Sequence, residues 1–250
     1  MGTVLAVVSG KGGTGKTALC AALGSCLAAK GQSVLMVDCD VGMGNLDIAL
    51  AMSGFATVNF LQPMDNVKTW DFIPKHPHVP NLFLLTAPVT VSAEQVDFDK
   101  FAAMLDVARA RFDWILLDAP AGIGSGFRLT VTPADQVVLV ATADPSSMRD
   151  GARTVEQVDL LGGKPMKLLV NRVSSHFFGA IKFTVDDAMD TVGLPLLGWV
   201  PEDKNVQLAS AKEQPLVLYT NKKAALACLH IAQRLAGAKV PVGRRFYGNL

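Results

Sequence analysis

Several features that mark common classes of protein are scarce in this chain of 250 residues. Charge of either sign is low, because 23 basic and 22 acidic side chains leave a net charge of +1. Without a basic excess, generic binding of nucleic acid over the whole surface is not expected. No apolar run reaches the roughly 18 residues that a membrane-spanning helix needs, and the amino terminus lacks the basic flank of a signal peptide. These absences predict a cytoplasmic protein.

Cysteine and histidine are also few, and neither is arranged as a metal site. The cysteines are Cys20, Cys26, Cys39 and Cys228. They form no CxxC pair and lie near no histidine cluster, so we expect buried, reduced thiols rather than disulfides or metal ligands. His76 and His78 stand in the segment Pro-His-Pro-His-Val-Pro. Its prolines favour a surface loop over a metal site.

Short apolar runs rich in Val, Ile and Leu alternate with segments of helical length. The runs at 4–8, 33–37, 82–86, 114–117, 136–141, 167–170 and 196–200 are predicted strands, and helices are predicted at 16–29, 93–109, 147–161, 181–192, 206–211 and 224–235. This alternation is typical of βαβ units. It predicts an α/β, doubly wound, mostly parallel sheet with helices on both faces, in one domain over residues 1–236. Residues 51–80 are expected to form an insertion over the sheet edge.

A glycine-rich segment follows the first predicted strand. Residues 10–17 read Gly-Lys-Gly-Gly-Thr-Gly-Lys-Thr and satisfy the P-loop pattern GxxxxGK[ST] between a strand and a helix. Glycines let backbone N–H groups surround phosphate oxygens, Lys16 adds a positive charge, and the Thr17 hydroxyl can bind Mg²⁺. The predicted phosphate-binding residues are Gly10, Gly12, Gly13, Thr14, Gly15, Lys16, Thr17 and Ala18. The motif predicts a P-loop NTPase with ATP and Mg²⁺ as cofactors.

Three carboxylates stand where predicted strands end. Asp38 and Asp40 follow the second strand, and their spacing of two places them on one side of an extended chain. One can order Mg²⁺-bound water while the other orients the attacking water. Asp118 closes the run Trp-Ile-Leu-Leu and precedes Ala-Pro-Ala-Gly, a pattern typical of a Walker B strand and a switch loop. An aspartate that caps the next helix is the alternative for Asp118.

The motifs together resemble one protein family. The loop KGGTGKT resembles the deviant Walker A loop of the superfamily that includes MinD, ParA and the nitrogenase iron protein. Residues 40–47, 118–127, 144–153, 169–172 and 197–203 resemble further motifs of the MinD family, so the resemblance covers about residues 3–237. It departs at Gly44, where many relatives carry a basic residue.

The resemblance assigns roles to individual residues. It implies that Lys11 contacts the nucleotide of a second subunit, although a solvated loop lysine is the alternative. It assigns Thr17, Asp38 and Asp118 to the magnesium site and Asp40 to the attacking water. The predicted catalytic residues are Lys11, Lys16 and Asp40. The predicted nucleotide-binding residues beyond the loop are Asn171, Arg172, Pro201 and Asp203. The alternative for Asn171 is a turn residue that ends a strand.

The resemblance also implies a cellular function. It predicts an ATPase that dimerises on ATP, associates peripherally with the inner face of the cell membrane, and positions the division site with a regulator like MinC or MinE. Arg149 and Asp150 are the predicted regulator face, with an ion pair within the helix or at its cap as the alternative. Residues 237–250 form a basic and aromatic tail that suits an anionic membrane. Its Pro241, Gly243 and Gly248 oppose a continuous helix, so a merely soluble tail is the alternative.

Other classes fit less well. A related positioning ATPase for flagella or other cargo shares every catalytic residue and differs only in partner surfaces. A DNA-partition ATPase needs a basic face, and Lys222 with Lys223 is the only obvious pair outside the tail, so DNA is an unlikely partner. A metal-cluster carrier is disfavoured because paired cysteines are absent.

Overall fold

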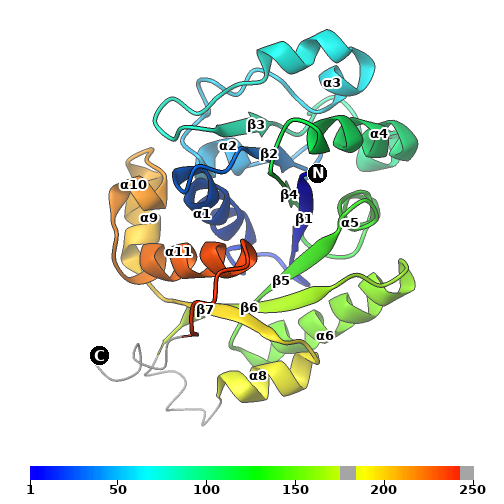
Figure 1. Ribbon diagram of the computed structural model, residues 1–250. Helices are drawn as coiled ribbons and strands as arrows, with labels where there is room; N and C mark the ends of the chain where they lie inside the picture. The colour runs from blue at the N-terminus through cyan, green and yellow to red at the C-terminus, as the bar shows by residue number, and fades with distance from the viewer. Residues whose placement is uncertain (175–183, 243–250) are drawn as a thin grey trace.

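A parallel sheet of seven strands organises the chain, in the order β3-β2-β4-β1-β5-β6-β7 (Figure 1). The computed structural model describes residues 1–174 and 184–242. The strands are β1 (Thr3–Val8), β2 (Val34–Asp38), β3 (Leu82–Leu85), β4 (Trp114–Asp118), β5 (Gln136–Thr142), β6 (Met166–Val173) and β7 (Leu196–Pro201). Every neighbouring pair is parallel. All seven predicted strands are therefore confirmed.

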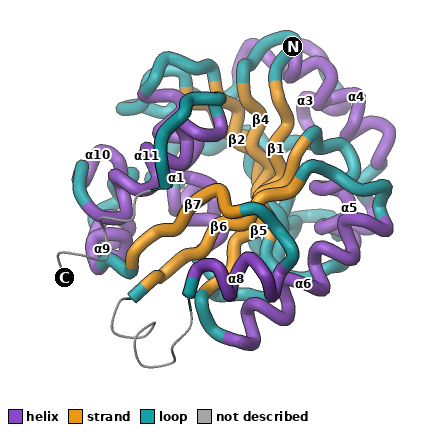
Figure 2. Tube along the Cα trace, turned by 60° about the horizontal axis from the view of Figure 1, so that its bottom comes forward, coloured by secondary structure: helices purple, strands orange, loops and turns teal. Residues whose placement is uncertain are grey.

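Helices cover both faces of this sheet (Figures 1 and 2). One face carries α1 (Lys16–Ala29), α2 (Leu46–Ala49), α9 (Lys204–Ala211), α10 (Leu216–Tyr219) and α11 (Lys223–Leu235), and the other carries α4 (Phe98–Arg109), α5 (Ser125–Val131), α6 (Pro145–Leu160) and α8 (Val185–Val192). Successive side chains of a strand point to opposite faces. In β1, Leu5 and Val7 accordingly pack into one core, and Val4, Ala6 and Val8 pack into the other. The doubly wound prediction is confirmed.

The helix predicted at 16–29 has the observed bounds, and the other predicted helices are present with at least one end shifted. The segment 93–109 is divided, because the Asp97 side chain accepts the N–H groups of Asp99 and Lys100 and starts α4 anew. A short 3₁₀ helix, η2 (Ala93–Gln95), precedes it. Helix α5 was not predicted, and residues 181–183 of the helix predicted at 181–192 lie outside the described residues.

Residues 51–80 lie along the edge strand β3, as predicted. They contain α3 (Leu61–Asp65) and the 3₁₀ helix η1 (Val67–Phe72), and single bridges join Asn59 to Thr86 and Lys75 to Phe83. The expectation that both histidines of this segment lie in a surface loop is wrong for His76, which is 3% exposed. Its Nε2 lies 2.9 Å from the Leu50 carbonyl oxygen, while Nδ1 accepts the N–H groups of His78 and Val79. Proline-rich sequence gave no sign of this buried ring.

The remaining composition-based expectations concern thiols and the membrane. All four cysteines are free and buried, as predicted. Within residues 1–174 and 184–242, no helix combines the length and the apolar character needed to cross a bilayer.

Candidate functional site

The predicted phosphate loop lies between β1, the central strand, and α1. Gly13 and Gly15 adopt the left-handed conformation, with φ of 79° and 84°. Gly15 is the N-cap of α1, and neither a capping side chain nor an acidic residue occupies the first turn. Because the first N–H groups of a helix have no partner within it, this end of α1 offers donors and a positive dipole to an anion.

Lys16 and Asp118 form a buried ion pair at this end of the sheet. Lys16 Nζ lies 2.7 Å from Asp118 Oδ1 and 3.3 Å from Thr17 Oγ1. The side chains are 8% and 2% exposed. Burial raises the pKa of Asp118, and the positive charge of Lys16 opposes that shift. Asp118 does not cap the next helix, since α5 begins after Gly124. The pair instead places the lysine of the loop beside the amino end of α1.

The carboxylates after β2 differ from one another in their surroundings. Asp38 is buried, and its oxygens accept the N–H groups of Asp40 at 2.9 Å and Leu46 at 3.0 Å. Burial raises the pKa of Asp38 to about 6. Asp40 is partly exposed and lies beyond the strand, which ends at Asp38. The role predicted for Asp40 from its spacing therefore concerns a residue just outside the paired strand.

The oxygen donors around Thr17 fit a magnesium ion. The Thr17 hydroxyl and the Asp118 carboxylate lie close enough for a hydrogen bond between them, which lowers the pKa of Asp118 against the effect of burial. Hydroxyl and carboxylate oxygens are hard ligands, and Mg²⁺ in nucleotide sites is commonly held by one or two such groups with water and phosphate oxygens. Among the described residues, no group of three His, Cys, Asp or Glu side chains is placed to hold a metal. The donor set thus suits Mg²⁺ bound together with a nucleotide.

Lys11 is paired rather than freely solvated. Its Nζ lies 2.9 Å from Asp144 Oδ1, and both side chains are about one-third exposed. Asp144 also accepts the Thr142 hydroxyl and the Ser147 N–H, and the latter bond caps α6. Partial burial raises the pKa of Asp144, but these hydrogen bonds and the Lys11 charge outweigh it and hold the pKa at about 2. Lys11 therefore has a charged partner within its own chain.

Strand β6 brings Asn171 back to the phosphate loop. The pairing of β6 with β7 loses its register between Val170 and Val173, and Arg172 has a φ of 54°. At this irregularity, Asn171 donates from Nδ2 to the Thr14 carbonyl oxygen at 2.8 Å. A Cβ atom on Gly15 would lie 2.4 Å from the same nitrogen, so the loop requires glycine there. Asn171 thus lies beside the loop, where an adenine-binding role was predicted.

A cavity of about 360 Å³ adjoins this contact. It gathers the predicted residues Gly15, Ala18, Asn171, Arg172, Pro201 and Asp203. Leu19, Leu216 and Ala224 complete its apolar wall, and motif reasoning missed them because apolar positions carry no distinctive pattern. Asp203 is mainly a cap here, since its oxygens accept the N–H groups of Asn205 and Ala224. A second hollow of about 410 Å³ shares Arg172 and Glu202 and extends to Lys11.

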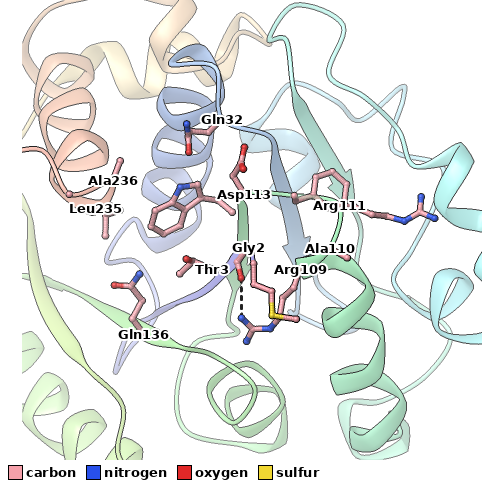
Figure 3. A pocket seen from close by; sticks show the side chains of 14 residues that line it. Gly2, Thr3, Gln32, Arg109, Ala110, Arg111, Asp113, Gln136, Leu235 and Ala236 are labelled. Atoms are coloured by element: carbon pink, nitrogen blue, oxygen red, sulfur yellow. Dashed lines mark hydrogen bonds between the residues drawn. The ribbon is translucent and has the colours of Figure 1, made fainter.

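A larger hollow of about 660 Å³ lies at the opposite, amino edge of the sheet (Figure 3). Arg109 lines it and donates to the Gly2 carbonyl oxygen at 3.1 Å. Arg109 also forms two bonds to Asp135, whose carboxylate accepts the Val4 N–H. No predicted site residue lies in this hollow.

The predicted regulator face lies on α6, close to the phosphate loop. A Cβ atom on Gly10 would lie 2.4 Å from the Asp150 carbonyl oxygen, so this turn of α6 packs on the loop. The Asp150 side chain lies 3.8 Å from Arg153, one turn later, whereas Arg149 is exposed. An ion pair within the helix is therefore present, although its partner is Arg153.

Comparison with known proteins agrees with this geometry. Residues 5–216 match the model of the CobQ/CobB/MinD/ParA nucleotide binding domain. The septum site-determining protein MinD of Synechocystis is 32% identical and is covered over 92% of its length by 96% of this chain.

Solved structures show the same similarity. The MinC:MinD cell division complex of Aquifex aeolicus contains a chain with 30% identity and a TM-score of 0.88, covering 97% of this chain and 98% of that one. MinD of Pyrococcus horikoshii, solved with Mg-ADP, has 27% identity and a TM-score of 0.81, covering 96% and 100%. The chain belongs to the CobQ/CobB/MinD/ParA nucleotide-binding family, and within it to the MinD proteins.

Proposed function

We propose that this protein is an Mg²⁺-dependent ATPase that dimerises on ATP and positions the cell-division site with a regulator protein. The observation that carries the proposal is the buried group of Lys16, Thr17 and Asp118 at the open end of α1. The relatives of this chain include proteins named for septum-site determination, and one similar structure holds MinC with MinD. The connected hollows provide space for a base at one end and for phosphates at the other.

The residues of this chain supply binding and charge. N–H groups of the phosphate loop and Lys16 hold the phosphates, and Asn171 fixes one side of the loop. Thr17 and Asp118 would hold Mg²⁺ at this site, and the ion would supply charge neutralisation for the phosphates. Asp40 orients the attacking water. When nucleotide binds, Lys16 moves from Asp118 to the phosphates. The Asp118 carboxylate is then free to take part in the magnesium site.

Lys11 is proposed to act on the nucleotide of a second copy. Its contact with Asp144 shows a cation at the rim of the site rather than within it. A cation supplied in trans stabilises charge that develops during phosphoryl transfer, which makes turnover depend on dimer formation.

A mixing experiment tests this role. Lys11→Ala and Asp40→Ala are each expected to abolish ATPase activity. Their equal mixture is expected to recover about a quarter of wild-type activity, because half of the dimers are mixed and each has one complete site. A mixture as inactive as its two components contradicts action in trans.

The membrane is the proposed site of assembly. Arg234 holds the start of the tail through the carbonyl oxygens of Val240 and Pro241, and the predicted cationic and aromatic residues at 244–247 lie outside the described residues. The tail has three cations, Lys239, Arg244 and Arg245. At about 1 kcal/mol each they bind weakly, so a dimer with two tails is needed for firm attachment.

Co-sedimentation with anionic liposomes tests this part of the proposal. The full chain is expected to pellet with ATP and to stay in solution with ADP. A chain that ends at Ala236 is expected to stay in solution with either nucleotide. Neutral liposomes are the control, and pelleting of the shortened chain contradicts a role for the tail.

A further inference from the structure

The loop that carries Asp40 is closed by one buried carboxylate. We call residues 39–45, between β2 and α2, the Asp40 loop. At its start, the Asp40 N–H donates to Asp38 Oδ1 at 2.9 Å. Just after its end, the Leu46 N–H donates to Asp38 Oδ2 at 3.0 Å. Both ends of the loop are thus tied to the side chain of a single strand residue.

Packing closes the loop further. Gly44 lies so close to this carboxylate that a Cβ atom on it would be 2.6 Å from Asp38 Oδ2 and 3.0 Å from Cγ. Leu46 is fully buried, so its N–H group has no access to water as a substitute partner. The N-cap of α2, Asn45, makes no capping bond of its own, which leaves Asp38 to satisfy the start of that helix. Loss of the Asp38 acceptor therefore leaves the buried Leu46 N–H group without a hydrogen-bond partner.

The loop makes further contacts through its backbone. Met43 donates its N–H to the Asp40 carbonyl oxygen, and the Gly42 N–H donates to Pro88. The Met43 side chain is 74% exposed. These contacts shape the tip, whereas Asp38 alone joins the two ends.

We propose that Asp38 is a positioning residue: its carboxylate holds the Asp40 loop closed and does so in place of binding the metal. The inference rests on the proposed function in one respect, since Asp40 is the residue proposed to orient water. Magnesium demands near-ideal octahedral geometry. A carboxylate held by two N–H groups, with Gly44 packed beside it, is not free to turn to meet that geometry. Asp118 differs, because its hydrogen-bond partners are the side chains of Lys16 and Thr17.

Two substitutions disturb the proposed contact in different ways. Asp38→Asn keeps the shape of the side chain but replaces one acceptor with an N–H₂ donor. Gly44→Ala leaves Asp38 in place and pushes a methyl group against it. Gly54→Ala is the matched control, since a Cβ atom there meets nothing within 4 Å.

Amide hydrogen exchange is measured first, on protein free of nucleotide and metal. We expect the amides of Asp40 and Leu46 to exchange about tenfold faster in Asp38→Asn and in Gly44→Ala. The reason is the loss of a hydrogen bond that slows exchange by about tenfold. Gly54→Ala is expected to match the wild type. This measurement remains valid even if the chain hydrolyses no ATP, so its failure is distinct from failure of the proposed function.

The Mg²⁺ dependence of ADP binding is measured second. The Mg²⁺ concentration at half-maximal binding is expected to stay within about twofold of wild type in Asp38→Asn and to rise about tenfold in Thr17→Ala. Unchanged exchange at Asp40 and Leu46 in Asp38→Asn overturns the proposal. A rise in the Mg²⁺ requirement of Asp38→Asn as large as that of Thr17→Ala also overturns it, whatever the exchange rates are.

Discussion

The two edges of the sheet both hold charged groups and a hollow, but they join those groups differently. At the carboxyl edge, Lys16 is paired with the carboxylate of Asp118, and Lys11 with that of Asp144. At the amino edge, Arg109 binds two carbonyl oxygens as well as the carboxylate of Asp135, which also accepts a backbone N–H. An arginine tied into the backbone is expected to be structural, whereas a lysine held only by side chains is expected to be able to move to a ligand.

The hollows support the same contrast. The amino-edge hollow of about 660 Å³ is larger than the cavity of about 360 Å³ beside Asn171. Size therefore does not identify the functional site in this molecule. The helix N-terminus and the strand ends do, because in α/β sheets they direct N–H groups and polar side chains toward one edge.

Removal of the Lys16 charge is expected to have the largest effect. In Lys16→Met, ADP affinity is expected to fall about 100-fold or more, because the phosphates lose their main cation. The free energy of unfolding is expected to fall by about 3 kcal/mol, since the Asp118 carboxylate remains buried without its positive partner. Isothermal titration and urea denaturation measure the two quantities. The double variant Lys16→Met/Asp118→Leu should regain stability without regaining affinity, and recovery of ADP binding contradicts this interpretation.

Two left-handed glycines at opposite ends of α1 give a matched pair. Gly15 has a φ of 84° and faces Asn171, whereas Gly31 has a φ of 87° and no atom within 4 Å of a Cβ position. Gly15→Ala is expected to weaken ADP binding about tenfold and to lower stability, because it displaces Asn171. Gly31→Ala is expected to cost about 1 kcal/mol of stability, from backbone strain alone, and to leave ADP affinity unchanged. If the two variants bind ADP with equal affinity, the contrast between the carboxyl edge and the amino edge of the sheet is wrong.

His76 lies near the start of β3, where its backbone N–H donates to the Leu82 carbonyl oxygen. Burial lowers the pKa of its ring below the ordinary 6.5, so the folded state favours the neutral form. The ring's contribution to stability is therefore complete above about pH 6.5 and is lost as the pH falls below that value. Urea denaturation between pH 5 and 8 measures this slope.

His76→Phe is the matching variant for this titration. It is expected to lower stability by about 2 kcal/mol at neutral pH, because it leaves two backbone N–H groups without their acceptor. The part of the pH slope due to His76 should disappear. An unchanged slope excludes His76 as its source, and ADP affinity should stay constant because this region lies away from the site.

Arg109→Met is expected to have the smallest effect. The Asp135 side chain is 44% exposed, so water can solvate its charge when the arginine is lost. Stability is expected to fall by about 1 kcal/mol, and ATPase activity and ADP affinity are expected to remain at wild-type values. A loss of activity larger than twofold contradicts the view of the amino edge as purely structural.

The sequence predicted well wherever one pattern governs one segment. Continuous apolar runs located all seven strands, and the loop motif placed Gly15, Lys16 and Thr17 at the start of α1, which begins at Lys16 as predicted. These features depend on local chemistry, which a reading of neighbouring residues captures.

No signal in the sequence marked the features that distant residues decide. Burial of His76 depends on Leu50, which lies 26 residues away, and capping of α11 by Asp203 spans 21 residues. The irregularity of β6 at Arg172 depends on β7, and the contact of Asn171 with Thr14 crosses 157 residues. Helix α5 escaped notice because it is only seven residues long and opens with Ser-Gly. Roles in metal binding and catalysis remain predictions.

The buried cysteines make the protein convenient to label. Burial raises the pKa of Cys26 to about 12 and raises those of Cys20, Cys39 and Cys228 as well. Thiolates are the species that react with maleimides, so the native thiols should react slowly while the protein is folded. One cysteine introduced at an exposed position such as Met43 or Val89 will then carry a single fluorophore, without replacement of any native cysteine.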